Sequence, residues 1–325
     1  MLTIRVDEFG HPSVLHPVEV PDPVPGPGEV LVEVEAAGVL FLDTILRRGG
    51  GPYPTTPPYV PGRGAAGRVV GVGPGVDVAG ADGHGSEWLG RRVLVDGPGT
   101  YAEQVVAPVS TLVPIPDGLG AREAMALLHD GGTALALIGA VGVRPGESVL
   151  VLPAAGGAGS LLVQLARRAG ARVVGAARGA AKVAVARNAG ADLVVDYGEP
   201  GWADAVRRRV GQVDVVLDGV GGPLGTESFG LVAEGGRFSN YGGSAGAPTV
   251  PDPGDAASRG IEVLGMAQLA GFAEGRRGRQ ERVLREAAEG RLTPIIARTF
   301  PLAKAADAHA ALENREIAGK ALLIP

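Results

Sequence analysis

Cysteine is absent from this chain of 325 residues. Its absence excludes disulfide bonds, thiolate nucleophiles and every zinc site that needs a cysteine ligand. The first ten residues carry Arg5, Asp7 and Glu8 and lack the apolar core of a signal peptide. We therefore expect a cytoplasmic protein.

Long hydrophobic runs and an excess of one charge are also missing. The longest apolar runs, such as residues 148–155, are far shorter than the ~20 residues of a membrane span. The 30 basic and 35 acidic residues are spread along the chain and leave a net charge of −5. This balance argues against nucleic acid or an anionic membrane as the main partner. Aromatic residues make up only 4% of the chain, so no aromatic cluster indicates the shape of a ligand.

Glycine and proline, by contrast, are abundant, with 54 and 26 residues. Disorder is nevertheless excluded, because a chain with 45% hydrophobic and only 20% charged residues has ample apolar surface to bury. The length indicates about two domains.

The first part of the chain, to about residue 116, has the texture of an irregular β domain. Residues 29–39 alternate, and the pattern places Val30, Val32, Val34 and Ala36 on one face of a strand. Frequent proline and glycine keep the elements short. Further strands are predicted at 68–72, 92–95, 101–107 and 111–114.

From about residue 121 helices and strands alternate. A helix predicted over 121–141 is interrupted near 130–132. Strands are then predicted at 148–152, 172–177, 192–196, 213–218, 236–241 and 261–265, with helices at 157–169, 180–189, 202–210 and 225–233. Six apolar strands joined by crossover helices predict an α/β fold with a doubly wound parallel sheet of order 3-2-1-4-5-6. The remaining elements, predicted at 279–289, 295–300, 303–313 and 320–324, are expected to return to the first domain. The predicted domains are 1–120 with 268–325, and 121–267.

A glycine-rich turn after the first of these strands is the strongest local motif. Residues 153–159 read Pro-Ala-Ala-Gly-Gly-Ala-Gly, with Ala154, Gly156 and Gly159 at the small positions of a dinucleotide-binding turn. Gly156 would let backbone amides approach a pyrophosphate, and Gly159 would let the helix pack on the strand. The alternative is a tight strand-to-helix turn that binds nothing.

Two cations follow the next strand. Arg178 lies 19 residues past Gly159, where NAD-binding proteins carry an acidic residue and an arginine accommodates the 2′-phosphate of NADP. No acidic residue occurs between Ser160 and Ala191, and Lys182 lies four residues after Arg178. The pair predicts NADPH rather than NADH. The alternative is two solvated surface cations.

The five histidines, which are His11, His16, His84, His129 and His309, do not form a metal motif. Their spacing matches neither a helical zinc motif nor the face of one strand, so no metal is expected.

The chain resembles a known family through segments that occur in the same order from end to end, namely 38–44, 61–67, 99–103, 132–135, 154–159, 218–221 and 319–324. It is similar to the zinc-independent medium-chain dehydrogenase/reductases of the quinone oxidoreductase (zeta-crystallin-like) branch. The resemblance implies a GroES-like β domain, a Rossmann domain, NADPH as the cofactor and a homodimer. Residues 261–266 are the edge strand best suited to pair with a second copy.

The resemblance also implies functions for single residues. The cofactor-binding set comprises Thr133, Ala154, Ala155, Gly156, Gly157, Ala158, Gly159, Arg178, Lys182, Tyr197, Val220, Gly221, Tyr241, Gly242 and Arg315. Lys182, Tyr197 and Arg315 would surround the 2′-phosphate, joined by Arg178. Donors to the acceptor, and thus the candidate catalytic residues, are Tyr53, Thr133 and Tyr241. His129 and Asp130 could also reach the substrate cleft, although an interior histidine and a helix cap are the commoner arrangements.

Two positions depart from the family. Leu40 stands where the family usually has Asn, and Ile45 stands where many quinone reductases have Tyr. Both changes make the cleft more apolar. The sequence therefore predicts an NADPH-dependent oxidoreductase that transfers a hydride to a small-molecule quinone or conjugated carbonyl. Two alternatives remain open, a reductase of 2-alkenals or enoyl thioesters and an NADPH-binding regulatory protein with little turnover.

Overall fold

The computed structural model describes residues 1–76 and 87–325, so His84 lies outside the described residues. The chain divides into two compact units. Unit 1 comprises residues 1–128, 280–291 and 295–325. Unit 2 comprises residues 129–279 and 292–294.

Unit 1 is built around a seven-stranded sheet in the order β14-β15-β3-β4-β5-β7, with β6 also paired to β3 and a separate hairpin of β1 and β2. Its strands are β1 (Leu2–Val6), β2 (Leu15–Glu19), β3 (Glu29–Val39), β4 (Gly64–Val72), β5 (Arg92–Asp96), β6 (Gln104–Pro108), β7 (Leu112–Pro114), β14 (Ile296–Pro301) and β15 (Lys320–Ile324). Its helices are α1 (Phe41–Arg47), α2 (Ala121–Leu128), α11 (Ala305–Glu313) and, from residue 280 onward, α10 (Arg276–Ala288), with three short 3-10 turns at Pro12–Val14, Val109–Thr111 and Leu302–Lys304.

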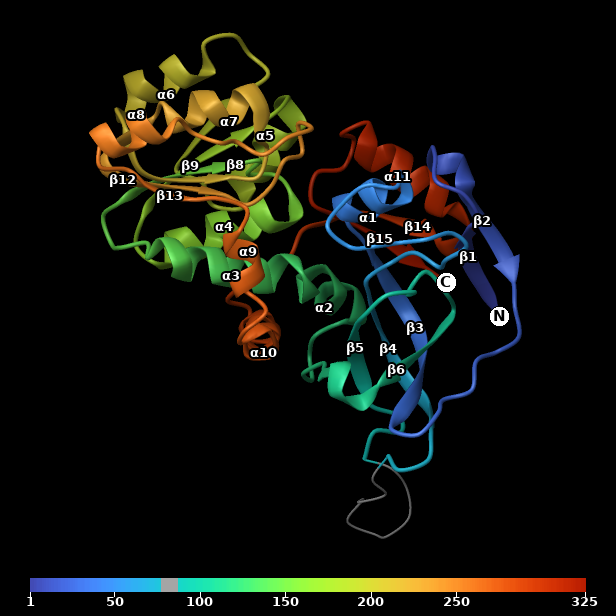
Figure 1. The fold of residues 1–325 in the computed structure, drawn as a ribbon. Helices are drawn as coiled ribbons and strands as arrows, with labels where there is room; N and C mark the ends of the chain where they lie inside the picture. The colour runs from blue at the N-terminus through green and yellow to red at the C-terminus, as the bar shows by residue number, and fades with distance from the viewer. Residues whose placement is uncertain (77–86) are drawn as a thin grey trace. The chain divides into compact units, whose positions relative to one another are not determined.

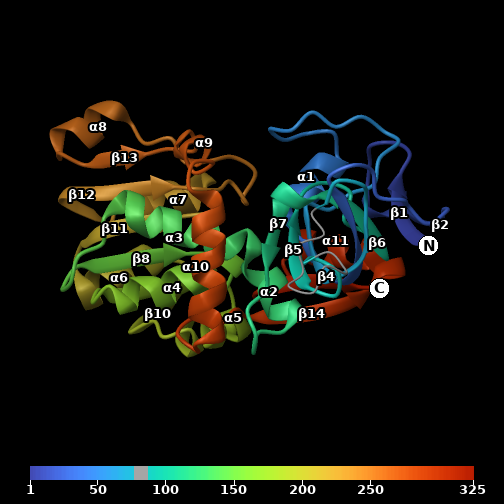
Figure 2. The same cartoon turned by 90° about the horizontal axis from the view of Figure 1, so that it is seen from below.

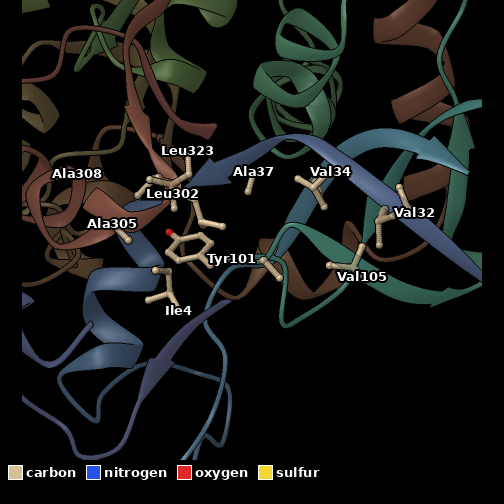
Figure 3. Close-up of a cluster of buried hydrophobic side chains, with 14 of the residues drawn as sticks. Ile4, Val32, Val34, Ala37, Tyr101, Val105, Leu302, Ala305, Ala308 and Leu323 are labelled. Atoms are coloured by element: carbon tan, nitrogen blue, oxygen red, sulfur yellow. The ribbon is translucent and has the colours of Figure 1, made fainter. Parts of the chain in front are cut away.

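The alternation of β3 explains the core of unit 1. Val30, Val32 and Val34 are buried, whereas Glu33 and Glu35, on the opposite face of the strand, are exposed. Side chains of the buried face meet residues from the C-terminal part of the chain, among them Leu302, Ala305, Ala308 and Leu323, in one apolar cluster (Figure 3). The C-terminal segment therefore belongs to this unit because its apolar side chains complete the core.

Helix α1 was not predicted from the sequence. Its N-cap position is Leu40, which has no side-chain acceptor, and the capping group is instead the carboxylate of Asp43, which accepts the Leu40 amide at 2.8 Å. A cap supplied from inside the first turn lacks the usual Ser, Thr, Asn or Asp signal ahead of the helix. The strand predicted over 101–107 is also shorter than expected, because β6 begins at Gln104.

Unit 2 is a six-stranded parallel sheet in the order β10-β9-β8-β11-β12-β13, which confirms the predicted 3-2-1-4-5-6 order (Figure 2). Its strands are β8 (Ser148–Leu152), β9 (Arg172–Ala177), β10 (Leu193–Asp196), β11 (Val213–Asp218), β12 (Val232–Asn240) and β13 (Glu262–Leu264). Its helices are α3 (Asp130–Val141), α4 (Gly157–Arg168), α5 (Ala180–Asn188), α6 (Trp202–Val210), α7 (Gly222–Phe229), α8 (Pro253–Ser258) and α9 (Gln268–Gly271). Helices α3 and α4 cover one face of the sheet, and α6, α7 and α8 cover the other (Figure 1).

Several predicted helices differ from the structure by one to four residues at an end, and the largest differences are at α7. The helix predicted over 225–233 is wrong at both ends, because α7 begins at Gly222 beside a proline in its first turn and Val232 already belongs to β12. The interruption predicted near 130–132 is confirmed close to that position, because α2 ends at Leu128, α3 begins at Asp130 and His129 separates them.

In the described part of the chain, no single helix is long and apolar enough to cross a membrane. The bent pair α2 and α3 passes the same test together by length and composition only.

Candidate active site

The predicted glycine turn connects β8 to α4. Strand β8 ends at Leu152, a cis peptide bond joins Leu152 to Pro153, and Gly156 is the N-cap of α4. A Cβ atom at Gly159 would collide with the carbonyl oxygen of Pro153. Only glycine therefore allows the first turn of the helix to pack this closely on the end of the strand.

The first turn of α4 has the features of an anion site. The amides of residues 157–159 have no acceptor within the helix, and the helix dipole adds positive potential at the same point. A Cβ atom at Gly156 would make only ordinary contacts with Pro153, so this position is not crowded by the protein. Glycines that leave room for a ligand at a helix N-terminus fit the pyrophosphate of a dinucleotide.

One carboxylate near this turn had not been assigned there from the sequence. A Cβ atom at Gly157 would collide with Oδ2 of Asp130, which shows that the Asp130 side chain lies against the start of α4. Asp130 is the first residue of α3, and its position next to α4 depends on the packing of the two helices. The sequence offered no signal for that packing beyond the position of Asp130 in the chain.

A buried carboxylate organises the ends of β11 and β12. Oδ1 of Asp218 accepts the amides of Val220 and Gly221 at 2.8 and 2.9 Å. Its Oδ2 accepts Nδ2 of Asn240 at 2.8 Å and the hydroxyl of Thr249 at 2.7 Å. Asp218 therefore fixes the predicted Val220–Gly221 segment, a role that the sequence did not reveal because two of its partners lie more than 20 residues away.

Tyr241 follows β12 and lies where three strands end. Its amide donates to the carbonyl oxygen of Asp218 at 2.8 Å, and its ring lies against Gly219. Its hydroxyl donates to the carbonyl oxygen of Leu152 across 3.5 Å, at the limit of a hydrogen bond. Burial and the charge of Asp218 raise the pKa of Tyr241, so the hydroxyl keeps its proton at neutral pH. The structure thus brings this predicted donor next to the glycine turn.

The predicted phosphate cations lie after β9. The guanidinium of Arg178 lies 5.6 Å from the ring centroid of Tyr197. Asp196, the last residue of β10, links the segments that follow β9 and β10. Its carboxylate accepts hydrogen bonds from the amides of Gly179 and Gly198 at 2.9 and 2.7 Å.

Lys182 lies in the first turn of α5, directly after the Gly179 cap. Three of the four predicted phosphate ligands, namely Arg178, Lys182 and Tyr197, therefore follow the neighbouring strands β9 and β10 in unit 2.

Other predicted residues are divided between the units. Thr133 is half-buried in the first turn of α3 in unit 2, and Gly242 follows Tyr241 there. Tyr53 belongs to unit 1, is 42% exposed and carries the guanidinium of Arg63 4.0 Å from its ring centroid. Arg315, the fourth predicted phosphate ligand, also belongs to unit 1.

Among residues 1–76 and 87–325, no group of three or more His, Asp or Glu side chains is placed to hold a metal ion.

Comparisons with known proteins agree with this arrangement. Residues 26–117 match the alcohol dehydrogenase GroES-like domain, and residues 189–323 match the zinc-binding dehydrogenase family. The "Probable quinone oxidoreductase" of Schizosaccharomyces pombe is 31% identical over 99% of this chain and 97% of its own length. The chain belongs to the quinone oxidoreductase family of the medium-chain dehydrogenase/reductases.

Two further members of the comparison bear on the chemistry of the family. The 2-haloacrylate reductase of a Burkholderia species is 33% identical over 93% of this chain and 92% of its own. The crystal structure of the Escherichia coli quinone oxidoreductase complexed with NADPH superposes with a TM-score of 0.89, at 29% identity and with full coverage of both chains. As a member of the quinone oxidoreductase family, the chain is an oxidoreductase with a GroES-like domain and a Rossmann domain.

Proposed function

We propose that this protein is an NADPH-dependent reductase of quinones or related conjugated carbonyl compounds. The observation that carries the proposal is the pairing of two features in unit 2. A glycine turn opens the N-terminus of α4, and a basic cluster of Arg178 and Lys182 follows β9. The NADPH complex of the Escherichia coli relative supports the choice of cofactor.

The residues present fit the cofactor. Residues 154–159 would hold the pyrophosphate with backbone amides. Arg178, Lys182 and Tyr197 would hold the 2′-phosphate with two cations and a phenol, together with Arg315 from unit 1. Thr133, Val220–Gly221 and Tyr241–Gly242 would line the nicotinamide. The cofactor, when bound, supplies the hydride that reduces the acceptor.

The chain's own contribution to the chemistry is orientation and a hydrogen-bond donor to the acceptor oxygen, while solvent supplies the proton. Reduction of a conjugated carbonyl places negative charge on its oxygen, and a hydrogen-bond donor lowers the energy of that charge. Tyr53, Thr133 and Tyr241 are the proposed donors. Tyr241 is the best placed of them, because it lies next to the glycine turn and the hydrogen bond that its hydroxyl donates to Leu152 is long, at 3.5 Å.

A second function is supported by Leu40 and by the Burkholderia relative. Leu40, half-buried, supplies no polar contact where the family usually has Asn. An apolar wall suits an alkenal or enoyl thioester, and the relative is named for a conjugated acid. A third candidate, an NADPH-binding regulatory protein with little turnover, predicts tight binding without oxidation.

A substrate panel distinguishes the three candidates. NADPH oxidation is followed at 340 nm with 1,4-benzoquinone and 1,2-naphthoquinone in one set and 2-alkenals and an enoyl thioester in the other. Faster turnover with quinones supports the first function, and faster turnover with alkenals supports the second. Tight NADPH binding with no oxidation across both sets would contradict both reductase functions.

We also propose a homodimer that pairs through β13. This strand is the end of the sheet in unit 2; Val263 within it is 38% exposed, and Met266 just after it is 40% exposed. They line an apolar groove with Pro248, Val250 and Pro253. A second copy, paired edge to edge, would satisfy the open backbone groups and cover the groove. Sedimentation of wild type and Val263→Asp tests this, and a monomeric wild type would contradict it.

A further inference from the structure

The three glycines of the turn before and within the start of α4 have different surroundings. A side chain at Gly159 would collide with the backbone of Pro153, and one at Gly156 would make only ordinary contacts. A side chain at Gly157 would collide with the carboxylate of Asp130. The space beside residue 157 is therefore occupied by a carboxylate of the chain itself, which the proposed function does not use.

This carboxylate lies where two helices begin. Asp130 is the first residue of α3, and Gly157 is the first residue of α4. The two helices pack against each other on the same face of the sheet (Figure 1). Each helix N-terminus carries about half a positive charge, so the two together offset the charge of an ionised carboxylate without a cation. The fold can therefore hold a negative side chain at this point.

Asp130 also faces the phenol at the end of β12. Helix α3 contacts β12, and Tyr241 follows that strand directly. The charge of Asp130 reaches the hydroxyl of Tyr241, where it contributes to the raised pKa of that group. The carboxylate is therefore near both the first turn of α4 and Tyr241. All of these residues belong to unit 2.

The order of the strands gives the direction in which a dinucleotide would cross this region. In a sheet of order 3-2-1-4-5-6, the ligand crosses the carboxyl ends of the strands at the switch point, which here lies between β8 and β11. The cations after β9 lie on one side of the glycine turn, and the ends of β11 and β12 lie on the other. With the adenosine end at the cations and the pyrophosphate at the turn, the next group toward Tyr241 is the second ribose.

The chemistry of a carboxylate matches this ribose. An ionised carboxylate can only accept hydrogen bonds, and the ribose presents uncharged hydroxyls that donate them. A pyrophosphate offers no donor and would be repelled by the carboxylate. Of the two groups closest to the start of α4, only the ribose is therefore a partner for Asp130.

We propose that Asp130 binds the hydroxyls of the ribose that lies between the pyrophosphate and the nicotinamide, and that residue 157 is glycine to make room for this carboxylate. The inference rests on the proposed function, because it needs a dinucleotide at the glycine turn. This ribose is the same in NADPH and NADH. Asp130 therefore contributes equally to the affinity for both cofactors, unlike Arg178 and Lys182.

The experiment compares Asp130→Asn with a matched control, Glu227→Gln, which removes one negative charge from an exposed residue near the end of α7. The probes, titrated by calorimetry, are 2′-phospho-ADP-ribose and 2′-phospho-ADP, which lacks the second ribose. We expect Asp130→Asn to weaken 2′-phospho-ADP-ribose about tenfold, because hydrogen bonds to a charged acceptor are lost. It should not weaken 2′-phospho-ADP, and Glu227→Gln should change neither affinity.

The comparison of the two probes decides between the possible roles of Asp130. Tighter binding of both probes by Asp130→Asn would show that the carboxylate only repels the pyrophosphate, and would overturn the proposal. Equal weakening of both would show a purely structural role and would overturn it too, as would unchanged affinities. A wild type that binds neither probe would instead overturn the proposed function.

A second variant, Gly157→Ala, tests the space beside the carboxylate. It keeps the charge of Asp130 but pushes the side chain away through the added Cβ atom. We expect it to weaken 2′-phospho-ADP-ribose more than 2′-phospho-ADP, in the same direction as Asp130→Asn. Equal losses for the two probes would overturn the proposed reason for glycine at residue 157.

Discussion

Replacement of Arg178 and Lys182 by alanine, in one double variant, tests the phosphate site of unit 2. Hydrogen bonds to charged groups contribute ~1.5–3 kcal/mol each. Arg178 is exposed and Lys182 is half-buried, so solvent screening reduces the contribution to about 1 kcal/mol per side chain. The loss of both is about 2 kcal/mol, which corresponds to about a 30-fold increase in the Kd for NADPH.

The assay is calorimetric titration of the double variant and the wild type with NADPH and, separately, with NADH. NADH lacks the 2′-phosphate, so its Kd should change little. Arg187→Ala is the matched control, because Arg187 is an exposed arginine in the last turn of the same helix α5. In the wild type, the difference between the Kd for NADPH and the Kd for NADH should also become smaller at high salt, since salt screens the interaction between exposed charges. Equal losses for NADPH and NADH would refute the assignment of these cations to the 2′-phosphate.

Three further predictions concern the glycine turn at Gly159, the buried titratable groups Asp43 and His309, and metals. Gly159→Ala should abolish NADPH binding and lower stability by about 1–3 kcal/mol through the collision with Pro153, whereas Gly139→Ala, in open space on α3, should raise stability by ~0.5–1 kcal/mol; equal melting temperatures for the two variants would contradict this. Burial raises the pKa of Asp43 to about 6, so its contribution to the stability of the fold falls by about 3 kcal/mol as pH rises from about 4 to about 6, whereas the lowered pKa of His309, about 3, makes the fold more stable as pH rises from about 3 to 6.5. Asp43→Asn removes the first effect, so the free energy of unfolding, measured in urea, should rise more steeply with pH in this variant, and an unchanged slope would contradict this. Chelators should not change activity, and stoichiometric metal in the purified protein would contradict that expectation.

Unit 2 was largely predictable from local sequence. Strands β8, β9 and β11 and helix α6 have the predicted bounds to the residue, because short apolar runs are flanked there by glycine or charged residues. The strand order followed from crossover helices and their fixed handedness.

The groups that organise the site were less predictable, because their partners lie far apart in the chain. Oδ2 of Asp218 accepts hydrogen bonds from Asn240 and Thr249, and Asp43 accepts one from Tyr101, whose hydroxyl is also hydrogen-bonded to His309. No local pattern marks such contacts. They arise when strands and helices pack, and only then do single polar residues acquire partners.

The most direct test of the account is a crystal structure of the protein grown with saturating NADPH. We predict the pyrophosphate at the amides of residues 156–159 and the 2′-phosphate between Arg178 and Lys182. A glycine turn without cofactor at that concentration, or an adenosine end bound away from these cations, would contradict the proposed reductase.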